Sequence, residues 1–196
     1  RQRGISVATS VMGFEYGGIK INILDTPGHQ DFQEDTFRTL TAADSVIVVI
    51  DVAKGVEPQT EKLVKVCRMR NIPIIVFINK LDRPGKDAFE LMDEIEQKLE
   101  LKVTPLSWPV GMGSDFRGVY NMYFKNLKLF NPGSQVIEES IDFDSLDNPE
   151  LEDYIGEKAG ELRDDQELVT GVYPELNLDD YLGGKISPVF FGSALN

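Results

Sequence analysis

The sequence predicts an α/β fold in which a mainly parallel sheet is flanked by helices. Two runs, 45–51 (SVIVVID) and 72–79 (IPIIVFIN), are almost continuously apolar and β-branched, which is typical of strands covered on both faces. A third run, 19–24 (IKINIL), follows a glycine pair and alternates in part, so we expect it to form a hairpin with 5–16. Helical stretches between these runs favour parallel strands with right-handed crossovers.

Three stretches between the strands have helical spacing. Residues 31–43 lie between the first and second strands. Residues 57–70 contain Pro58, which suits a first helical turn. We expect this helix to present one face made of Leu63, Val66, Cys67 and Arg70. Residues 86–101 predict a further helix, with a face made of Phe89, Met92, Ile95 and Leu99.

The pattern changes after residue 103. Residues 104–130 hold short apolar pieces separated by Gly and Pro, which predicts short strands and turns. Residues 147–169 predict one helix that starts near Asn148-Pro149. Its apolar side is expected to comprise Leu151, Tyr154, Ile155 and Leu162. The final run, 186–196, is again strand-like. We therefore predict a core of residues 1–103 and 186–196, with 104–185 as an inserted subdomain.

Acidic residues are concentrated in one part of the chain. The 196 residues carry a net charge of −13, and 41% are hydrophobic, enough for a sizeable core. Residues 138–180 contain 16 acidic and two basic side chains, whereas the remainder has 17 acidic and 18 basic ones. We expect a solvated acidic surface on the insertion. Such a surface repels nucleic acid, so any RNA-linked role must use other surfaces or protein partners.

The composition also argues against several classes. No apolar run approaches the roughly 20 residues of a membrane span, and we expect no membrane partner. The one cysteine, Cys67, excludes an internal disulfide and suits the cytoplasm, where we expect it to be packed in a helix. One His and one Cys cannot build a typical zinc cluster, and Ser-His nucleophilic catalysis lacks a recognisable elbow. We expect Trp108, Phe190 and Phe191 in the core.

Three polar motifs fall at the carboxyl ends of predicted strands, where open parallel sheets bind ligands. They are DTPGH (25–29), NKLD (79–82) and GSALN (192–196). Each alone is a weak signal, since such sequences also serve as turns or helix caps. Their order, with RGIS (3–6) before the first, is the informative feature.

In this order the motifs resemble those of the translational GTPases. The series RGIS, DTPGHQDF, NKLD and SAL is similar to the family's successive nucleotide motifs after the first. Stretches 34–63 and 106–123 look like its termination branch; elongation factor G shares the style of the first stretch but not the second. The resemblance implies a cytoplasmic GTP hydrolase that uses GTP/GDP and Mg²⁺, works on the ribosome and promotes departure of class I release factors. The alternatives are another ribosomal GTPase, similar to elongation factor G, or a non-catalytic interaction module.

Within this resemblance, four residues would serve the phosphate side. Asp25 would bind the water shell of Mg²⁺, which prefers oxygen ligands. Gly28 has no Cβ, so its N–H can approach a γ-phosphate, and His29 would position the attacking water. Ser6 would offer its hydroxyl to Mg²⁺. The family usually has Thr at that position, so neighbouring Thr9 remains an alternative.

Five residues would serve the base. Asp82 would accept hydrogen bonds from guanine N1–H and the exocyclic amine, a donor pair that adenine lacks. Asn79 would tie the loops together, and the Lys80 stem would cover the purine face. Ser193 would brace the base loop, and the Ala194 N–H would meet the guanine oxygen.

The first motif of the family, G-x-x-x-x-G-K-[ST], does not occur in these 196 residues. In the resembled family it follows a strand that lies between the first and second strands predicted here. We therefore expect a fragment that is inactive alone. We also expect the open slot to be filled by rearrangement, by strand exchange with a second copy, or by an upstream segment.

Overall fold

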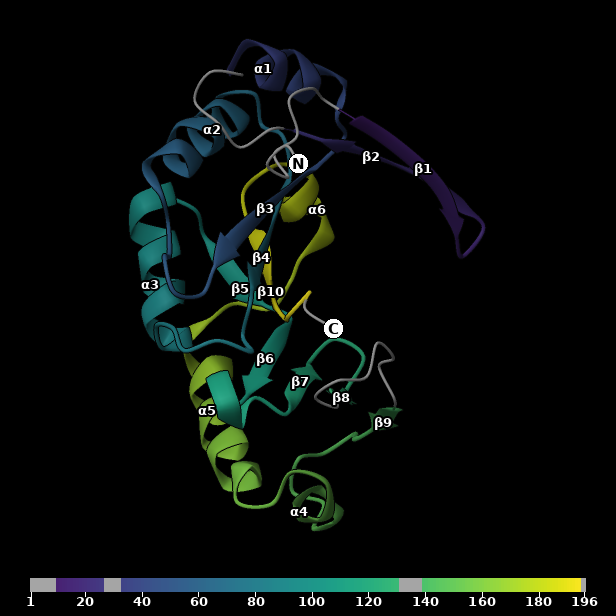
Figure 1. Ribbon diagram of the computed structural model, residues 1–196, viewed down its shortest axis with the longest axis vertical. Helices are drawn as coiled ribbons and strands as arrows, with labels where there is room; N and C mark the ends of the chain where they lie inside the picture. Colours follow the sequence, from purple (N-terminus) through teal and green to yellow (C-terminus); the bar gives the residue numbers. More distant parts are fainter. Residues whose placement is uncertain (1–9, 27–32, 131–138, 195–196) are drawn as a thin grey trace, which may run out of the picture. The chain divides into compact units, whose positions relative to one another are not determined.

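The N-terminal unit of the chain contains a hairpin and a helix. The computed structural model describes residues 10–26, 33–130 and 139–194 and divides the chain into units 1–46 and 47–196 (Figure 1). Strands β1 (Ser10–Tyr16) and β2 (Ile19–Asp25) pair antiparallel, as predicted. Gly17 and Gly18 join them with φ of 56° and 75°, the positive values that a tight hairpin turn requires. Helix α1 (Gln33–Ala42) follows where a helix was predicted.

A four-stranded sheet forms the centre of the second unit. Its order is β3-β4-β10-β5, in which β3 spans Val46–Asp51, β4 Ile74–Asn79, β10 Ser187–Phe191 and β5 Val103–Pro105. Strand β10 runs parallel to both neighbours. The predicted mainly parallel sheet is thus confirmed, and the last strand in the sequence lies inside it rather than at its edge.

Two helices follow β3 and β4 and contribute to the core. Helix α2 (Pro58–Met69) starts at the predicted proline, and α3 (Ala88–Leu99) contacts it; both lie on the left in Figure 1. The predicted face of α3 is largely correct, because Met92, Ile95 and Leu99 are buried. Phe89 is half-buried, with its ring centroid 4.7 Å from that of buried Trp108.

The predicted face of α2 was partly wrong. Cys67 is buried as expected, and burial raises the pKa of its thiol. The other buried residue of this helix is Val64, whereas Arg70 is exposed beyond the helix end. Spacing alone admits two adjacent faces, and the buried one carries Val64.

A second sheet follows β5 in the chain. Strands β6 (Ser107–Val110), β7 (Gly118–Asn121), β8 (Asn126–Leu129) and β9 (Glu139–Asp142) form an antiparallel meander. The 3-10 helix η2 (Gly113–Asp115) lies between the first two. These short strands agree with the pattern expected for 104–130. The domain limits proposed from sequence, 1–103 with 186–196 and 104–185, remain a proposal.

The single helix predicted over 147–169 is instead two helices. Helix α4 (Glu150–Ile155) ends at Gly156, which has a φ of 59°, and α5 (Lys158–Val172) begins two residues later. A glycine in the left-handed region ends a helix readily because it has no Cβ. Tyr154 is 44% exposed, contrary to the predicted face, whereas the other three residues of that face are buried. Helix α6 (Leu178–Leu182) precedes β10.

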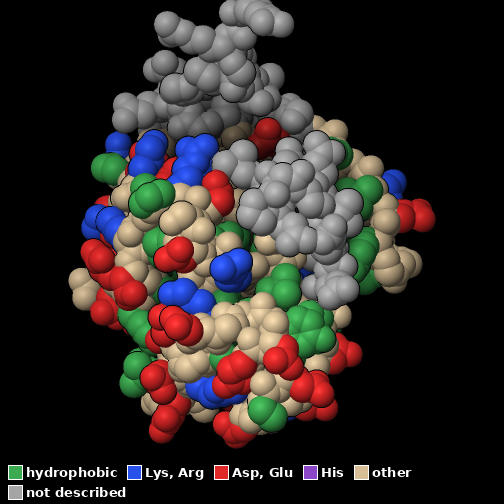
Figure 2. Space-filling view, turned by 60° about the horizontal axis from the view of Figure 1, so that its bottom comes forward, with side chains coloured by type: hydrophobic (Ala, Val, Ile, Leu, Met, Phe, Trp, Pro, Cys, Tyr) green, Lys and Arg blue, Asp and Glu red, His purple; other side chains and the backbone are tan. Residues whose placement is uncertain are grey.

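The acidic segment lies largely on the surface. Acidic side chains spread over the lower part of the view in Figure 2. Exposed acidic residues of α4, α5 and the turn between them include Glu152, Asp153, Glu157, Asp164 and Glu167. The predicted core aromatic residues Trp108 and Phe191 are buried, whereas Phe190 is half-buried. Within the described ranges, no helix is long and apolar enough to cross a membrane.

Strands β2 and β3 belong to separate sheets. In the described part of the chain, β2 pairs with β1 and β3 pairs with β4, and no strand bridges β2 and β3. On β3, Ile47 and Val49 are 61% and 58% exposed. Among the described strands, β3 is the end strand of its sheet, and the filling of the slot expected beside it remains a prediction.

Candidate functional site

The ends of β4 and β10 bring two of the polar motifs together. These strands are parallel neighbours with Ile78 opposite Phe191, so the residues that follow them emerge at one sheet edge. The Gly192 N–H donates to the Ile78 carbonyl at 2.9 Å, and the Leu81 N–H donates to the Gly192 carbonyl at 3.3 Å. A Cβ on Gly192 would lie 2.8 Å from the Phe77 ring, so glycine permits this close crossing.

Asn79 links the two motifs through its side chain. Its Oδ1 accepts the Ala194 N–H at 2.9 Å and the Lys80 N–H at 2.8 Å. One amide oxygen therefore fixes the start of its own loop and the loop after β10. The Ala194 N–H, which sequence reasoning directs to a purine oxygen, is engaged by Asn79 here. A purine oxygen would have to share this donor or displace the amide oxygen.

Asp82 and Ser193 are in direct contact. The Ser193 hydroxyl donates to Asp82 Oδ1, while Arg83 Nε lies 3.9 Å from Asp82 Oδ2. The Asp82 side chain remains 33% exposed. Each carboxylate oxygen has more than one acceptor direction, so Asp82 retains capacity for donors from outside the protein. Ser193 can thus orient the Asp82 carboxylate without occupying all of its acceptor positions.

Lys80 reaches a residue that sequence reasoning missed. Its Nζ lies 2.7 Å from Asp51 Oδ2, and its backbone has a φ of 71°, in the left-handed region. Hydrogen bonding from Lys80 lowers the pKa of Asp51 below its ordinary value of 3.8; burial opposes this shift, and the Ala53 and Lys54 N–H groups add to it. Its position in the sequence could have indicated this role, because Asp51 is the last residue of β3 just as Asn79 is the last residue of β4.

Glu94 fastens the loop that follows Asp51. This carboxylate, 10% exposed, accepts from Lys86 Nζ at 2.6 Å, Lys98 Nζ at 2.7 Å and the Val56 N–H at 3.2 Å. Burial alone would raise the pKa of Glu94, but these donors outweigh it and lower the pKa. A Cβ on Gly55 would meet Glu94 Oε2 at 2.4 Å, so the loop packs closely on α3. No motif in the sequence points to this role of Glu94.

The predicted phosphate-side residues fall in the N-terminal unit. Asp25 is the last residue of β2 and is exposed. Ser6, Thr9, Gly28 and His29 lie outside the described residues, so their predicted roles remain predictions. Among the residues that the structure describes, no group of three His, Cys, Asp or Glu side chains is arranged to hold a metal ion. A single carboxylate acting through metal-bound water, as expected for Asp25, would not form such a group.

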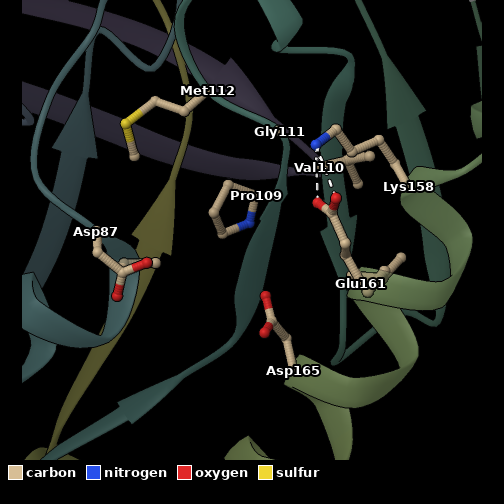
Figure 3. Close-up of a pocket in the computed structure, with 10 residues that line it drawn as sticks. Asp87, Pro109, Val110, Gly111, Met112, Lys158, Glu161 and Asp165 are labelled. Carbon is tan, nitrogen blue, oxygen red and sulfur yellow. Dashed lines mark hydrogen bonds and ion pairs between the residues drawn. The ribbon is translucent and has the colours of Figure 1, made fainter.

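A separate cavity of about 240 Å³ lies among α3, β6 and α5 (Figure 3). Its charged lining residues all have partners within the protein. Asp87 caps α3 by accepting the Phe89 N–H at 2.9 Å, and Lys158 Nζ lies 2.8 Å from Glu161 Oε2. Asp165 accepts the Trp108 indole N–H at 2.8 Å, and burial raises the pKa of this carboxyl. These contacts support a structural role for the charged side chains that line the cavity.

The comparison with known families decides the class of the domain. The sequence matches the elongation factor Tu GTP-binding domain family over residues 1–196. The chain belongs to that family. It is a translational-GTPase type of GTP-binding domain, and the α/β fold predicted from sequence agrees with this membership.

A solved structure supports the fold of this GTP-binding domain. The crystal structure of a protein from Thermus thermophilus is similar with a TM-score of 0.70 and 22% sequence identity. The match covers 96% of this chain and 30% of that protein. This chain therefore spans less than a third of the length of the protein it matches.

Proposed function

We propose that this GTP-binding domain holds the guanine base at the edge where β4 and β10 end. The observation that supports it is the convergence of Asn79 and Asp82 with Ser193 and Ala194, joined by hydrogen bonds across more than a hundred residues of sequence. Guanine presents N1–H and an exocyclic amine side by side, and the Asp82 carboxylate is suited to accept both. Adenine lacks that pair of donors and would leave the carboxylate unpaired.

On the phosphate side we propose the roles that the sequence suggests. Mg²⁺ would be held by the Ser6 hydroxyl, with Thr9 as the alternative, and through water by Asp25. The Gly28 N–H would meet the γ-phosphate, and His29 would place the attacking water in line. Phosphoryl transfer depends chiefly on such placement and on charge stabilisation. The family's first phosphate-binding motif is absent from these residues, so we expect this chain alone to bind GTP or GDP poorly.

For the whole protein we propose bacterial peptide chain release factor 3. It would act on the ribosome in the cytoplasm and use its GTP cycle to promote departure of class I release factors. The support is the resemblance of residues 34–63 and 106–123. The alternative is an elongation factor G-like translocase, which the family membership accommodates equally well.

The deciding experiment measures magnesium-dependent binding of GDP, GTP and ADP to this chain and to a chain extended upstream. We expect the extended chain to bind guanine nucleotides and reject ADP. Asp82→Asn should weaken GDP and favour xanthine nucleotide, because an amide presents a donor where guanine also presents one. Asp93→Asn, an exposed carboxylate on α3, is the matched control and should bind normally.

Three results would count against this proposal. Equal affinity for ADP and GDP would exclude guanine recognition, and an unchanged base preference in Asp82→Asn would remove Asp82 from it. Tight binding by this chain alone, in the submicromolar range typical of a complete nucleotide site, would contradict the need for the upstream motif. Two assays with the whole protein and ribosomes separate the candidate roles. Stimulated departure of release factors supports release factor 3, whereas stimulated translocation supports an elongation factor G-like protein.

A further inference from the structure

We propose that Asp51 is a positioning residue of the base site: it holds the Lys80 ammonium so that the lysine stem is ready to cover the guanine. This inference rests on the proposed function, because the base is the ligand that the stem would cover. Asp51 belongs to none of the polar motifs found in the sequence. Its position at the end of β3 places it beside the loop after β4.

The contact between the two side chains is short but partly open to water. Lys80 Nζ lies 2.7 Å from Asp51 Oδ2, and the two side chains are 38% and 19% exposed. An ion pair this exposed contributes little to folding stability. Its effect is therefore on conformation: the flexible lysine stem loses much of its rotamer freedom before a ligand arrives. The free energy of nucleotide binding then does not have to offset the entropy lost on ordering the lysine stem.

The lysine is also fixed at its backbone. Its φ of 71° is uncommon for a residue with a Cβ, and two hydrogen bonds hold the peptide there. The Lys80 N–H donates to Asn79 Oδ1 at 2.8 Å, and its carbonyl accepts the Arg83 N–H at 2.9 Å. With the ammonium held by Asp51, both ends of the side chain are defined.

Asp51 is itself held in place. Its Oδ1 accepts the Ala53 N–H at 2.9 Å and the Lys54 N–H at 3.4 Å, which leaves Oδ2 for the ammonium. The loop is tied to β4 through the Val52 N–H and the Asn79 carbonyl at 3.0 Å, and to α3 through Glu94. A site residue supported by such a shell of contacts keeps its geometry when the ligand binds.

A purely structural role, in which Asp51 only forms the turn after β3, can be separated from this one. The turn uses Oδ1, whereas the contact with Lys80 uses Oδ2. Asp51→Asn keeps an oxygen for the turn and replaces the other by an NH₂ group, which cannot accept a hydrogen bond from an ammonium. Lys80→Met keeps an apolar stem and removes the ammonium.

The test is a double-mutant cycle on GDP affinity in the full-length protein that carries this sequence. We expect Asp51→Asn to weaken GDP binding roughly three- to tenfold, as for loss of one partly exposed ion pair. Lys80→Met should weaken GDP binding by a similar factor. The double variant should bind GDP no more weakly than the single variant with the lower affinity. Glu57→Gln is the control, since Glu57 is a carboxylate in the same loop that pairs with Lys54 at 3.4 Å.

A second measurement needs no nucleotide. Acetylation of Lys80, followed by mass spectrometry with the exposed Lys102 as the internal reference, should become faster in Asp51→Asn and stay unchanged in Glu57→Gln. Thermal unfolding of each variant, followed by fluorescence of buried Trp108, verifies that it folds.

The outcomes distinguish the two proposals. If the unaltered protein binds no guanine nucleotide, the proposed function fails and the role of Asp51 at the base fails with it. If it binds but Asp51→Asn behaves like Glu57→Gln, only the role of Asp51 is overturned. Additive effects of the Asp51 and Lys80 substitutions likewise overturn it while the proposed function stands. A coupled loss of affinity, together with faster acetylation, supports the inference.

Discussion

The Ala194 N–H donates to the side-chain oxygen of Asn79 at 2.9 Å, although 115 residues separate the two along the chain. The same oxygen accepts the Lys80 N–H. One side chain thus ties the loop after the last strand to the loop after β4. The geometry of the proposed base site depends on this link, because Asp82 lies in one loop and Ser193 in the other.

Asn79→Ala should therefore lower both stability and nucleotide affinity. Loss of two hydrogen bonds to a partly buried oxygen should cost about 1–3 kcal/mol in the free energy of unfolding. GDP affinity of the upstream-extended chain should fall by roughly tenfold or more, since about 1.4 kcal/mol corresponds to a factor of ten. Chemical denaturation and GDP titration measure the two effects.

The matched control is Asn121→Ala. Asn121 Oδ1 also accepts two backbone N–H groups, those of Tyr123 and Phe124 at 3.0 and 2.9 Å, in the turn after β7. This variant should lose stability but keep its GDP affinity. Equal loss of affinity in both variants would mean that the Asn79 effect is only a general loss of folding.

His29→Ala tests the proposed placement of the attacking water. We expect this substitution to leave GTP affinity of the extended chain nearly unchanged and to slow ribosome-stimulated hydrolysis by at least about a hundredfold, as for loss of a water-positioning group. Nucleotide titration and single-turnover hydrolysis give the two quantities. A parallel fall in binding and turnover would instead assign the histidine a structural role.

Glu94→Gln should change how stability depends on pH. The folded pKa of Glu94 is lowered from 4.5, so this carboxylate stabilises the folded state above its unfolded pKa. That contribution is lost as pH falls through the folded pKa. The unaltered chain should therefore lose stability on acidification below about pH 5, and Glu94→Gln should lose less over the same range.

Chemical denaturation at several pH values measures this difference. At pH 7 the Gln variant should be less stable by about 1–3 kcal/mol, because it weakens the hydrogen bonds from two ammonium groups and a backbone N–H. Glu57→Gln serves as the control, since Glu57 is half-exposed and its partner Lys54 is 61% exposed. If the free energy of unfolding fell equally with pH in all three proteins, the pKa of Glu94 would not contribute to the acid dependence of stability.

Asp165→Asn should stabilise the second unit at neutral pH. Burial raises the pKa of Asp165, and nearby Asp87, Glu161 and Asp164 raise it further. Ionisation therefore disfavours the folded state as pH rises through the interval between the unfolded and folded pKa values. An asparagine keeps an acceptor for the Trp108 indole without the charge, so the gain should be roughly 0.5–1 kcal/mol at pH 7.

The fluorescence of Trp108, the one tryptophan in the chain, gives an independent readout. Its emission should titrate with a midpoint above 3.8, the ordinary value for Asp, and this transition should disappear in Asp165→Asn. Asp164→Asn, an exposed neighbour on α5, should change stability by less than about 0.5 kcal/mol and keep the transition. Persistence of the transition in Asp165→Asn would assign it to another group.

The strands and the meeting of two polar motifs were predictable because they follow from local patterns. Continuous β-branched runs identified β3 and β4, and parallel neighbours necessarily place Asn79 and Gly192 at one edge. Helix faces were less predictable. On α2, spacing could not choose between faces containing Leu63 or Val64, since the packing of the folded chain determines which one is buried.

The supporting residues of the site were not predictable for a related reason. Asp51 and Glu94 are ordinary acidic residues in sequence, one at a strand end and one within a helix. Their roles arise from partners such as Lys80 and Lys86 that the fold brings to them. Similarly, the break between α4 and α5 depends on the left-handed backbone of Gly156, and this residue type also occurs within helices.

The position of β10 has a consequence for how the protein is made. On the ribosome, residues 46–105 emerge long before Ser187–Phe191, yet β10 lies between β4 and β5 in the finished sheet. A nascent chain that ends before residue 187 therefore leaves β5 without its parallel neighbour and the Asn79 side chain without Ala194. Ordering of the edge where β4 and β10 end should thus be a late event in synthesis, completed only when the last strand enters the middle of the sheet.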